Sequence, residues 1–314
     1  MTHTADNRAG LTRSAAFASI AAAMLLVGLK IWASIQTGST AMLGSLADSS
    51  LDLIASLATL VGVWIAAQPA DENHRFGHGK AEALAAMFQV MLIALSAAAI
   101  GFRAIEKLVE GGRTSAAAEG IGVSIIAIAA TLCLLMWQRY VIRRTGSVAI
   151  SADHVHYQSD LLLNLAVIAA LALDQYAGFG RADPLFGIAI AAWLIWGAWR
   201  AASEAVDHLM DREWADEKRE RFVEIAARHP QLRNLHDLRT RTSGANDFAQ
   251  FHVDMPSSMP VGQAHDIIER VEADLCGHFP DLELFIHIDP EGHVDEPDNP
   301  LAEEDEFKKL EKGK

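Results

Sequence analysis

The chain contains very little cysteine. Its 314 residues include only two, Cys133 in an apolar stretch and Cys276 in a predicted soluble helix. Such a low number excludes a disulfide framework, so both side chains are expected to be buried reduced thiols. Reduced cysteines are consistent with a soluble part that faces the cytosol.

Basic residues are scarce relative to acidic ones. Lys and Arg number 26 against 40 Asp and Glu, which gives a formal net charge of -14 and a pI of ≈ 5.3. A phosphate-binding surface normally shows clustered Lys and Arg in excess, so nucleic acid is not expected as a partner. A cleavable signal peptide is not expected either, because the first apolar run is too long and lacks a clear small-residue cleavage site.

Apolar residues are abundant in the first two thirds of the chain. Hydrophobic residues make up 51% of the sequence and the mean hydropathy is +0.16, although the last third is visibly charged. Six segments are long enough to cross a hydrocarbon layer of about 30 Å at about 1.5 Å per residue. They are predicted at residues 13–35, 40–67, 83–108, 117–142, 148–175 and 183–209.

The chain therefore divides into a membrane part and a soluble part. We expect a cytoplasmic arm at 1–12, a six-helix membrane domain at 13–211, a small α+β domain at 212–290 and a charged, disordered tail at 291–314. In the soluble part, helices at 215–230 and 261–279 and strands at 235–244, 247–255 and 282–290 give the order αββαβ. Alternation along the second strand places Phe251 and Val253 on one face and His252 on the other.

Basic residues at the segment ends set the expected orientation. Most of them, including Arg8, Arg13, Arg75 and Arg212, fall on one side of the membrane. The positive-inside rule then places both termini in the cytoplasm. The first three and last three segments run with opposite topology, which suits alternating access to a site near the bilayer midplane.

Four ionisable side chains interrupt the apolar segments. Asp48 and Asp52 lie in the second segment and His156 and Asp160 in the fifth, each pair spaced i,i+4 on one helix face. A charged carboxylate at the bilayer centre costs about 3 kcal/mol on insertion scales, which makes these residues functional candidates. Three carboxylates and one imidazole suit Zn²⁺, and protons would compete for the same atoms, with His156 the natural carrier. The alternative is that one pair is a hydrogen-bonding patch between helices.

A second group of potential ligands lies in the loop between the second and third segments. Asp71, His74 and His78 could form a three-ligand metal site if the end of the loop becomes helical. Such a site would position the loop rather than take part in transport. The alternative is that these histidines are solvated or cap a helix.

Taken together, several motifs resemble the cation diffusion facilitator family, specifically its bacterial zinc- and iron-exporting branch. Over residues 10–290 they are, in order, SLADSSLD, PADENHRFGHGKAE, HYQSDLLLN, HDLRTR, QFHVDM, QAH and IHIDP. The resemblance implies a homodimer with a six-helix membrane domain and a metallochaperone-like αββαβ cytoplasmic domain. It also implies exchange of cytoplasmic Zn²⁺ for protons across the bacterial inner membrane, with Fe²⁺ and Cd²⁺ open as further substrates, and no enzymatic activity.

The resemblance assigns roles to individual residues. Asp48, Asp52, His156 and Asp160 would form the transport site, and Asp71, His74 and His78 an interfacial metal site. A zinc site that stabilises the dimer would use His236, His252, His265, His287 and Asp289. On the sequence alone these histidines would be surface residues, except that His287 and Asp289 share a strand face. A charged interlock would join Lys80 to Asp211. The remaining histidines are expected to be non-ligands: His3, His154, His208, His229, His278 and His293.

Two other classes of function are weighed against a zinc/proton antiporter. A metal-sensing or scaffold protein that had lost transport would be expected to lack part of the membrane quartet, which is intact here. A transporter of organic cations would need an apolar, aromatic-lined cavity. The predicted cavity residues are instead compact oxygen and nitrogen ligands.

Overall fold

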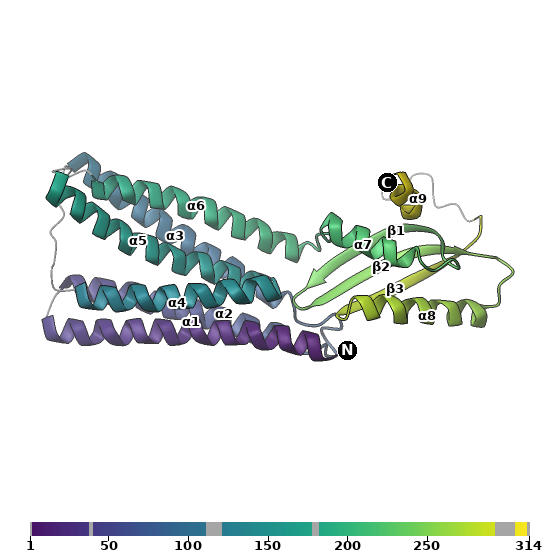
Figure 1. Ribbon diagram of the computed structural model, residues 1–314. Helices are drawn as coiled ribbons and strands as arrows, with labels where there is room; N and C mark the ends of the chain where they lie inside the picture. Colours follow the sequence, from purple (N-terminus) through teal and green to yellow (C-terminus); the bar gives the residue numbers. More distant parts are fainter. Residues whose placement is uncertain (1, 38–39, 111–120, 178–181, 293–304, 313–314) are drawn as a thin grey trace. The chain divides into compact units, whose positions relative to one another are not determined.

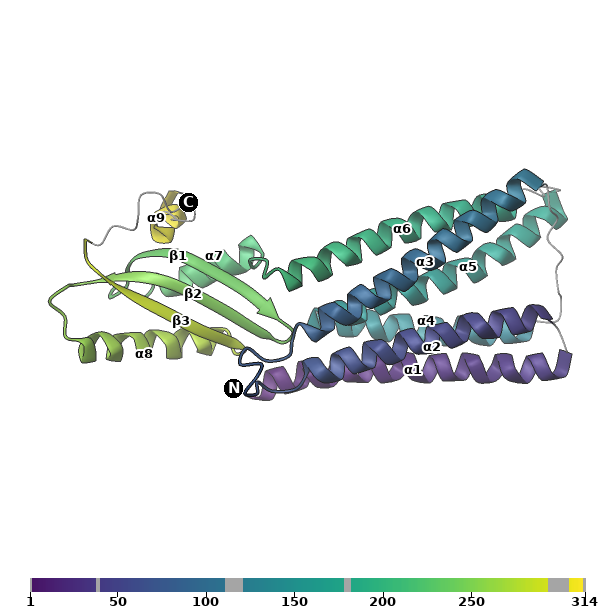
Figure 2. The same ribbon diagram turned by 180° about the vertical axis from the view of Figure 1, so that it is seen from behind.

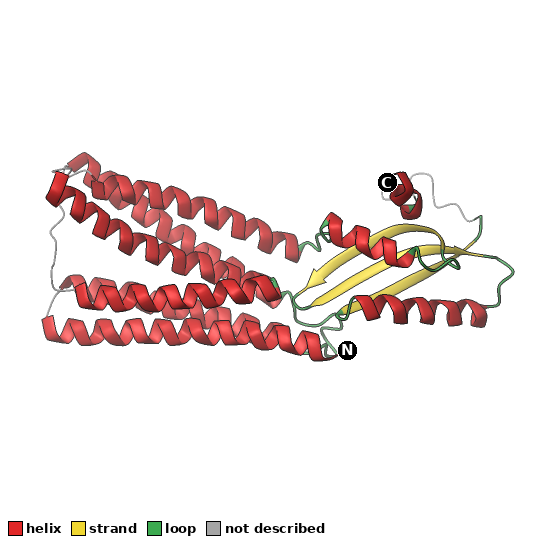
Figure 3. Ribbon diagram, viewed as in Figure 1, coloured by secondary structure: helices red, strands yellow, loops and turns green. Residues whose placement is uncertain are grey.

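The computed structural model describes residues 2–37, 40–110, 121–177, 182–292 and 305–312. The chain forms two compact units, one comprising Arg8–Val206 and the other comprising Asp207–Lys314 together with Met1–Asn7. Long helices make up the first unit, and a three-stranded sheet with helices makes up most of the second (Figures 1 and 3).

Six long helices form the first unit. Their bounds are α1 Thr2–Thr37, α2 Thr40–Ala66, α3 Ala81–Glu110, α4 Ile121–Thr145, α5 Val148–Ala177 and α6 Ala182–Leu209. Within the described residues, all except α5 contain a stretch long and apolar enough to cross a membrane. α5 is more polar because its first half carries Asp153, His154, His156 and Asp160. The predicted six-helix membrane fold is confirmed, and α1 begins well before the predicted start at residue 13.

The helices fall into two groups in space. Both views place α1, α2 and α4 on one side and α3, α5 and α6 on the other (Figures 1 and 2). These groups differ from the sequence halves, because α3 and α4 have exchanged sides. α5 nevertheless contacts α2 and α4 as well as α3. It therefore links the two groups, as does the packing of α2 against α3.

Small residues allow close approach between helices at two places. A Cβ atom on Gly62 of α2 would lie 2.4 Å from the Cβ of Ala85 in α3, and one on Gly187 of α6 would lie 2.9 Å from the Cβ of Ala104 in α3. Helices in lipid gain little from the hydrophobic effect, so their association depends on this kind of close van der Waals packing. Larger residues at these glycines would push the helices apart.

The second unit contains a three-stranded sheet. Its elements are α7 Asp216–Ala226, β1 Arg233–Ser243, β2 Asn246–Met255, α8 Val261–His278 and β3 Leu282–Pro290. The central strand β2 pairs antiparallel with β1 and parallel with β3. The parallel pair requires a crossover, which α8 supplies. This is the αββαβ order predicted from the sequence.

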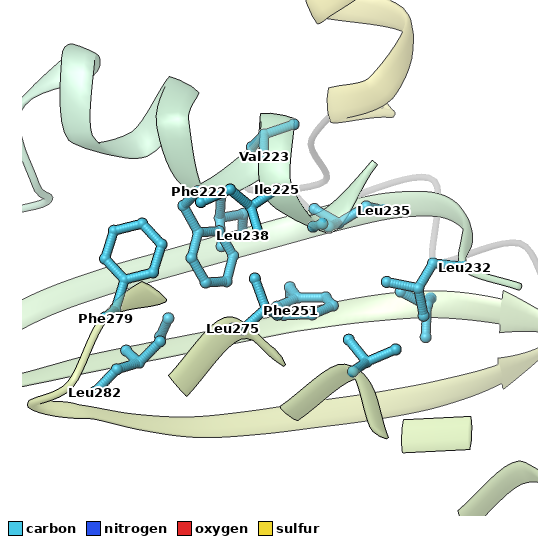
Figure 4. Close-up of a cluster of buried hydrophobic side chains, with 14 of the residues drawn as sticks. Phe222, Val223, Ile225, Leu232, Leu235, Leu238, Phe251, Leu275, Phe279 and Leu282 are labelled. Atoms are coloured by element: carbon cyan, nitrogen blue, oxygen red, sulfur yellow. The ribbon is translucent and has the colours of Figure 1, made fainter. Parts of the chain in front are cut away.

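An apolar core packs between one face of this sheet and its helices (Figure 4). Phe251 of β2 is fully buried, and its ring meets that of Phe222 of α7 edge-on at 5.8 Å. Fully burying one such side chain contributes about 1.5–3 kcal/mol. Val253 is buried on the same face, whereas His252 lies on the opposite face and is partly exposed. The predicted alternation is confirmed, and it leaves polar side chains on the other sheet face.

The expectation of a disordered tail at 291–314 is wrong for residues 305–312. This segment contains the helix α9, Glu306–Lys312, while residues 293–304 lie outside the described part of the chain. Arg219 of α7 donates to Glu306 at 2.9 Å, and Phe307 and Leu310 pack against the apolar core. So short a helix is stabilised by packing rather than by its own propensity.

Candidate metal sites

The first group of potential ligands lies between membrane helices α2 and α5. Ligand atoms of Asp52, His156 and Asp160 all lie within 4.8 Å of one another. His156 Nε2 donates to Asp52 Oδ1 at 3.0 Å, and the two side chains are 8% and 15% exposed. Three of the four predicted transport ligands are therefore brought together. Asp48 stands one turn before Asp52 on α2, but its side chain lies outside the described part of the structure.

A neighbouring tyrosine fixes this part of α5. Tyr157 is fully buried, and its ring meets that of His156 edge-on at 5.7 Å. Its hydroxyl donates to the backbone oxygen of Ser19 in α1 at 3.1 Å and shares a hydrogen bond of 2.9 Å with Ser56 in α2. The helix that carries His156 and Asp160 is thus anchored to two others beside the ligand group.

The donor set of this group suits a divalent metal. Imidazole nitrogen and carboxylate oxygen are the usual ligands of Zn²⁺ outside thiolate sites. When no metal is bound, however, His156 Nε2 must supply the proton of its hydrogen bond to Asp52, because an ionised carboxylate can only accept. Metal can bind both residues only after that proton leaves.

Sequence reasoning missed Asp153, which lies on the same helix. Its side chain is fully buried and accepts hydrogen bonds from Ser19, Gln89 and Gln138. The signal was present, since Asp153 precedes His156 by three residues and Asp160 by seven, spacings that place all three on one helix face. The cost of a carboxylate in a membrane helix applied to it as well.

The second group lies in the loop between α2 and α3. Ligand atoms of Asp71, His74 and His78 lie within 4.8 Å of one another. The predicted helical end of the loop is not observed, since α3 begins only at Ala81. A turn at Gly77, with φ 77°, brings the two rings to 4.5 Å instead. Glycine suits this position because a left-handed φ costs it little.

Hydrogen bonds prepare this loop for a cation. His78 Nδ1 donates to the backbone oxygen of Pro69 at 3.2 Å, and His78 Nε2 lies 3.3 Å from Asp71 Oδ2. A backbone acceptor for the second ring nitrogen is common in metal-binding histidines, because it turns the other nitrogen toward the ligand group. The backbone N–H of His74, which donates to Asp71 Oδ1 at 2.6 Å, lowers the pKa of that carboxyl below 3.8.

The third group lies on the polar face of the sheet in the second unit. Ligand atoms of His236, His252 and Asp289 lie within 4.8 Å of one another. His236 Nδ1 donates to the backbone oxygen of Asn234 at 2.7 Å, and its Nε2 faces Asp289 Oδ2 at 3.7 Å. His252 Nδ1 donates to the same carboxylate oxygen at 2.8 Å.

Irregular pairing of β1 directs His236 toward this group. The register of β1 against β2 shifts on both sides of His236, and Asn234 and Asp237 both have φ 50°. Bulges of this kind turn side chains out of the regular alternation and are common next to functional sites. Asp237 Oδ2 also lies 3.8 Å from His252 Nε2, a neighbour that the sequence did not indicate.

The two remaining predicted members of this third group have different surroundings. The ring of His287 lies 4.5 Å from that of His252, and its Nε2 is 3.4 Å from Asp289 Oδ1, so it borders the group. His265 is exposed on α8 and pairs with Glu269 at 3.5 Å. The structure does not bring His265 together with the others in one chain, and its role stays a prediction.

The predicted interlock between Lys80 and Asp211 spans the two units. Lys80 lies in the turn before α3 in the first unit. Asp211 follows α6 in the second unit with φ 55°, and its Oδ1 is 3.3 Å from Arg241 Nη1. The interlock stays a prediction.

Several histidines expected to be non-ligands have other hydrogen-bond partners. His154 Nδ1 bonds Gln138 Oε1 at 3.1 Å, His229 Nε2 bonds Asp274 Oδ2 at 3.0 Å and His278 Nδ1 bonds the backbone oxygen of Asp274 at 2.9 Å. The side chain of His3 and the whole of His293 lie outside the described residues.

Six long helices with a ligand group between two of them, followed by an αββαβ domain with a ligand group on its sheet, define a membrane transporter of metal cations. The family model for the cation efflux transmembrane domain matches residues 16–210, and the model for the cation efflux protein cytoplasmic domain matches residues 214–291. The chain belongs to the cation efflux family. It is thus a multi-pass membrane protein with a cytoplasmic C-terminal domain, and not an enzyme.

Individual relatives cover most of the chain. The cation-efflux pump FieF of Cronobacter sakazakii is 44% identical over 280 residues, which are 89% of this chain and 93% of that protein. The FieF pump of Escherichia coli is 43% identical over 280 residues, again 89% and 93% of the two chains. Among solved structures, the zinc form of CzrB is 31% identical with a TM-score of 0.25, and covers 27% of this chain and 99% of its own.

Proposed function

We propose that this protein exports cytoplasmic Zn²⁺ in exchange for protons across the bacterial inner membrane. Metal would bind Asp48, Asp52, His156 and Asp160, and alternating access would expose this site to each side in turn. The observation that carries the proposal is the 3.0 Å hydrogen bond between His156 Nε2 and Asp52 Oδ1. It is supported by membership of the cation efflux family.

The hydrogen bond supports exchange rather than simple metal conduction. The proton between His156 and Asp52 must leave before a metal can bind both residues, and it can return only after the metal has gone. The same two atoms would thus carry either a proton or the metal. A site of this kind needs no separate proton path, because each transport cycle displaces one cargo with the other.

The cytoplasmic domain is proposed to bind zinc and to stabilise a homodimer. His236 Nε2 faces Asp289 Oδ2 at 3.7 Å, and His236 Nδ1 donates to a backbone oxygen, as is common for metal-binding histidines. This group lies on the sheet face opposite the apolar core, where a second copy of the domain could supply further ligands. Zinc that binds only the dimer would shift the monomer–dimer equilibrium by mass action.

The loop group of Asp71, His74 and His78 is proposed to bind a structural metal ion. Asp71 and His74 are 49% and 59% exposed at their side chains, so the group is much more open to water than the membrane site. Bound metal there would hold the turn between α2 and α3. We assign it no part in carrying the substrate.

Transport into proteoliposomes tests the proposed function. Full-length protein is reconstituted, the lumen is made acidic, and uptake of Zn²⁺, Fe²⁺, Cd²⁺ or Mn²⁺ is followed one cation at a time. Zinc uptake should be faster with the acidic lumen than without it, and a protonophore should remove that acceleration. Absence of gradient-dependent zinc uptake would contradict the proposal and would favour the alternative of a metal sensor or scaffold. Uptake of another of these cations would define the wider selectivity, which ligand chemistry alone does not fix.

A further inference from the structure

Asp153 of α5 is an ionisable residue of the membrane unit that belongs to none of the three ligand groups. It has 0% exposed surface. A buried charge is costly unless hydrogen bonds compensate it, and here three side chains do so. Ser19 Oγ and Gln138 Nε2 donate to Oδ2 at 2.6 and 2.8 Å, and Gln89 Nε2 donates to Oδ1 at 2.7 Å.

These hydrogen bonds tie α5 to its neighbours. Ser19 belongs to α1, Gln89 to α3 and Gln138 to α4, and Gln89 Nε2 also reaches Thr59 Oγ1 of α2 at 3.2 Å. Because all three partners of Asp153 donate, both of its oxygens accept, which fits the ionised carboxylate. Hydrogen bonds to an ionised acceptor are roughly twice as strong as those between neutral groups. The network therefore resists rotation or sliding of α5.

Asp153 lies on the same face of α5 as two ligands of the membrane group. His156 follows it by three residues and Asp160 by seven. At about 1.5 Å per residue, these Cα atoms stand ~4.5 and ~10.5 Å further along the helix axis. Any shift of α5 that breaks the Asp153 hydrogen bonds would also move His156 Nε2, which lies 3.0 Å from Asp52.

We propose that Asp153 is a positioning residue for metal transport. It fixes the rotation of α5 and its position along the helix axis, and thereby holds His156 and Asp160 opposite Asp52. The inference rests on the proposed assignment of these three residues to the transport site. Asp153 does not bind the metal in this account, so its replacement weakens zinc binding without removing a ligand.

The acid of Asp153 and the amide of Gln89 can be exchanged to test this network. In Asp153→Asn, the amide oxygen can keep the bonds to Ser19 and Gln138, but the new amide nitrogen then faces Gln89 Nε2, donor against donor. Turning the Gln89 amide does not repair this, because Gln89 Oε1 is buried with no hydrogen-bond partner among the described residues. Turning would place a buried N–H there instead. Gln89→Glu supplies the missing acceptor and returns the negative charge to the network.

Zinc binding by purified full-length protein tests the inference. His78→Ala and Asp289→Ala first disable the loop and cytoplasmic groups, and Asp160→Ala in that background identifies the remaining binding as that of the membrane site. Asp153→Asn and Gln89→Glu should each raise the Kd for zinc by about tenfold or more, the usual cost of losing a group that orients a ligand. The double variant should bind with nearly the original affinity. Ser19→Ala, which removes only one donor, should cause a smaller rise and serves if Asp153→Asn does not fold.

Two results would overturn the inference. The first is an unchanged Kd in folded Asp153→Asn or, if that variant does not fold, in Ser19→Ala. The second is a double variant that binds zinc no better than the worse single variant. If the Kd is unchanged and zinc flux has lost its pH dependence, Asp153 would be a proton carrier instead. A wild-type protein that binds zinc at this site but shows no flux would contradict the proposed function alone, because the binding comparison would still decide the role of Asp153.

Discussion

His156 Nε2 lies 3.0 Å from Asp52 Oδ1, and this contact joins the two helices that carry the membrane ligand group. A hydrogen bond of this length needs one proton between the nitrogen and the carboxylate oxygen. Zn²⁺ would need the same nitrogen lone pair and the same carboxylate. The contact is therefore the point at which proton and metal are proposed to compete.

Replacing this histidine should alter metal selectivity. His156→Asp creates an all-oxygen group, which suits harder ions such as Mn²⁺ better than one with imidazole does. We expect a weaker preference for Zn²⁺ over Mn²⁺ and a flatter pH dependence of binding near neutrality. Competition between the two ions in proteoliposomes measures this, with His208→Asp as a control outside the ligand groups. An unchanged preference would mean that His156 does not set selectivity.

The loop group predicts a pH dependence in strongly acidic solution. The backbone N–H of His74 lowers the pKa of Asp71 below its ordinary value of 3.8. Ionised Asp71 therefore stabilises the turn fully above pH 3.8, and this contribution is lost as the pH falls through the lower folded-state pKa.

Carbon-13 NMR titration of the aspartate carboxyls in metal-free protein can check this expectation. The Asp71 signal is identified by its loss in Asp71→Asn, and Glu72→Gln serves as a neighbouring control. A midpoint above 3.8 would show that the turn does not stabilise the ionised form.

The cytoplasmic domain should dimerise more tightly with zinc. A fragment of residues 207–314 contains the sheet, its core and α9. Sedimentation should show zinc-dependent dimerisation that His252→Ala with Asp289→Ala removes, because both ligands leave the group. His229→Ala with His278→Ala is the matched control, since this pair contacts Asp274 instead. Dimerisation that is equally tight without zinc would rule out the linkage.

Helix α9 should contribute to the stability of the same fragment. Phe307 and Leu310 are partly buried against the core. Phe307→Ala is expected to lower the free energy of unfolding by about 1–3 kcal/mol, at or below the range for fully buried phenylalanine. Lys308→Ala is the control, because its side chain is 72% exposed. Equal urea midpoints for Phe307→Ala and wild type would show that α9 does not pack stably.

The sequence was informative where a pattern repeated and weak where contacts are non-local. Alternation along β2 correctly predicted the buried face of Phe251, because burial on one sheet face imposes a period of two. Helical spacing correctly paired His156 with Asp160. The proximity of Asp52 to them depends on the packing of α2 against α5, which periodicity does not encode and the family resemblance supplied.

Other features could not be predicted in this way. In α9, Phe307 and Leu310 provide only one i,i+3 pair, too little to indicate a helix, and its formation depends on contacts with α7 and β1. The turn that joins His74 to His78 depends on a positive φ at Gly77, not on helical spacing. Asp153 was predictable in principle from its cost in a membrane helix, but its partners on α1, α3 and α4 were not.

Simultaneous measurement of zinc and proton movement tests the central claim most directly. Vesicles with full-length protein carry one dye for zinc and one for pH in an acidic lumen, and Zn²⁺ is added outside. Wild-type protein and Glu106→Ala, an exposed carboxylate of α3 outside the ligand groups, should take up zinc while protons leave. Asp52→Ala and Asp160→Ala should remain folded and lose both movements, because each lacks a ligand. Near-normal coupled flux in either variant would contradict the assignment of the transport site.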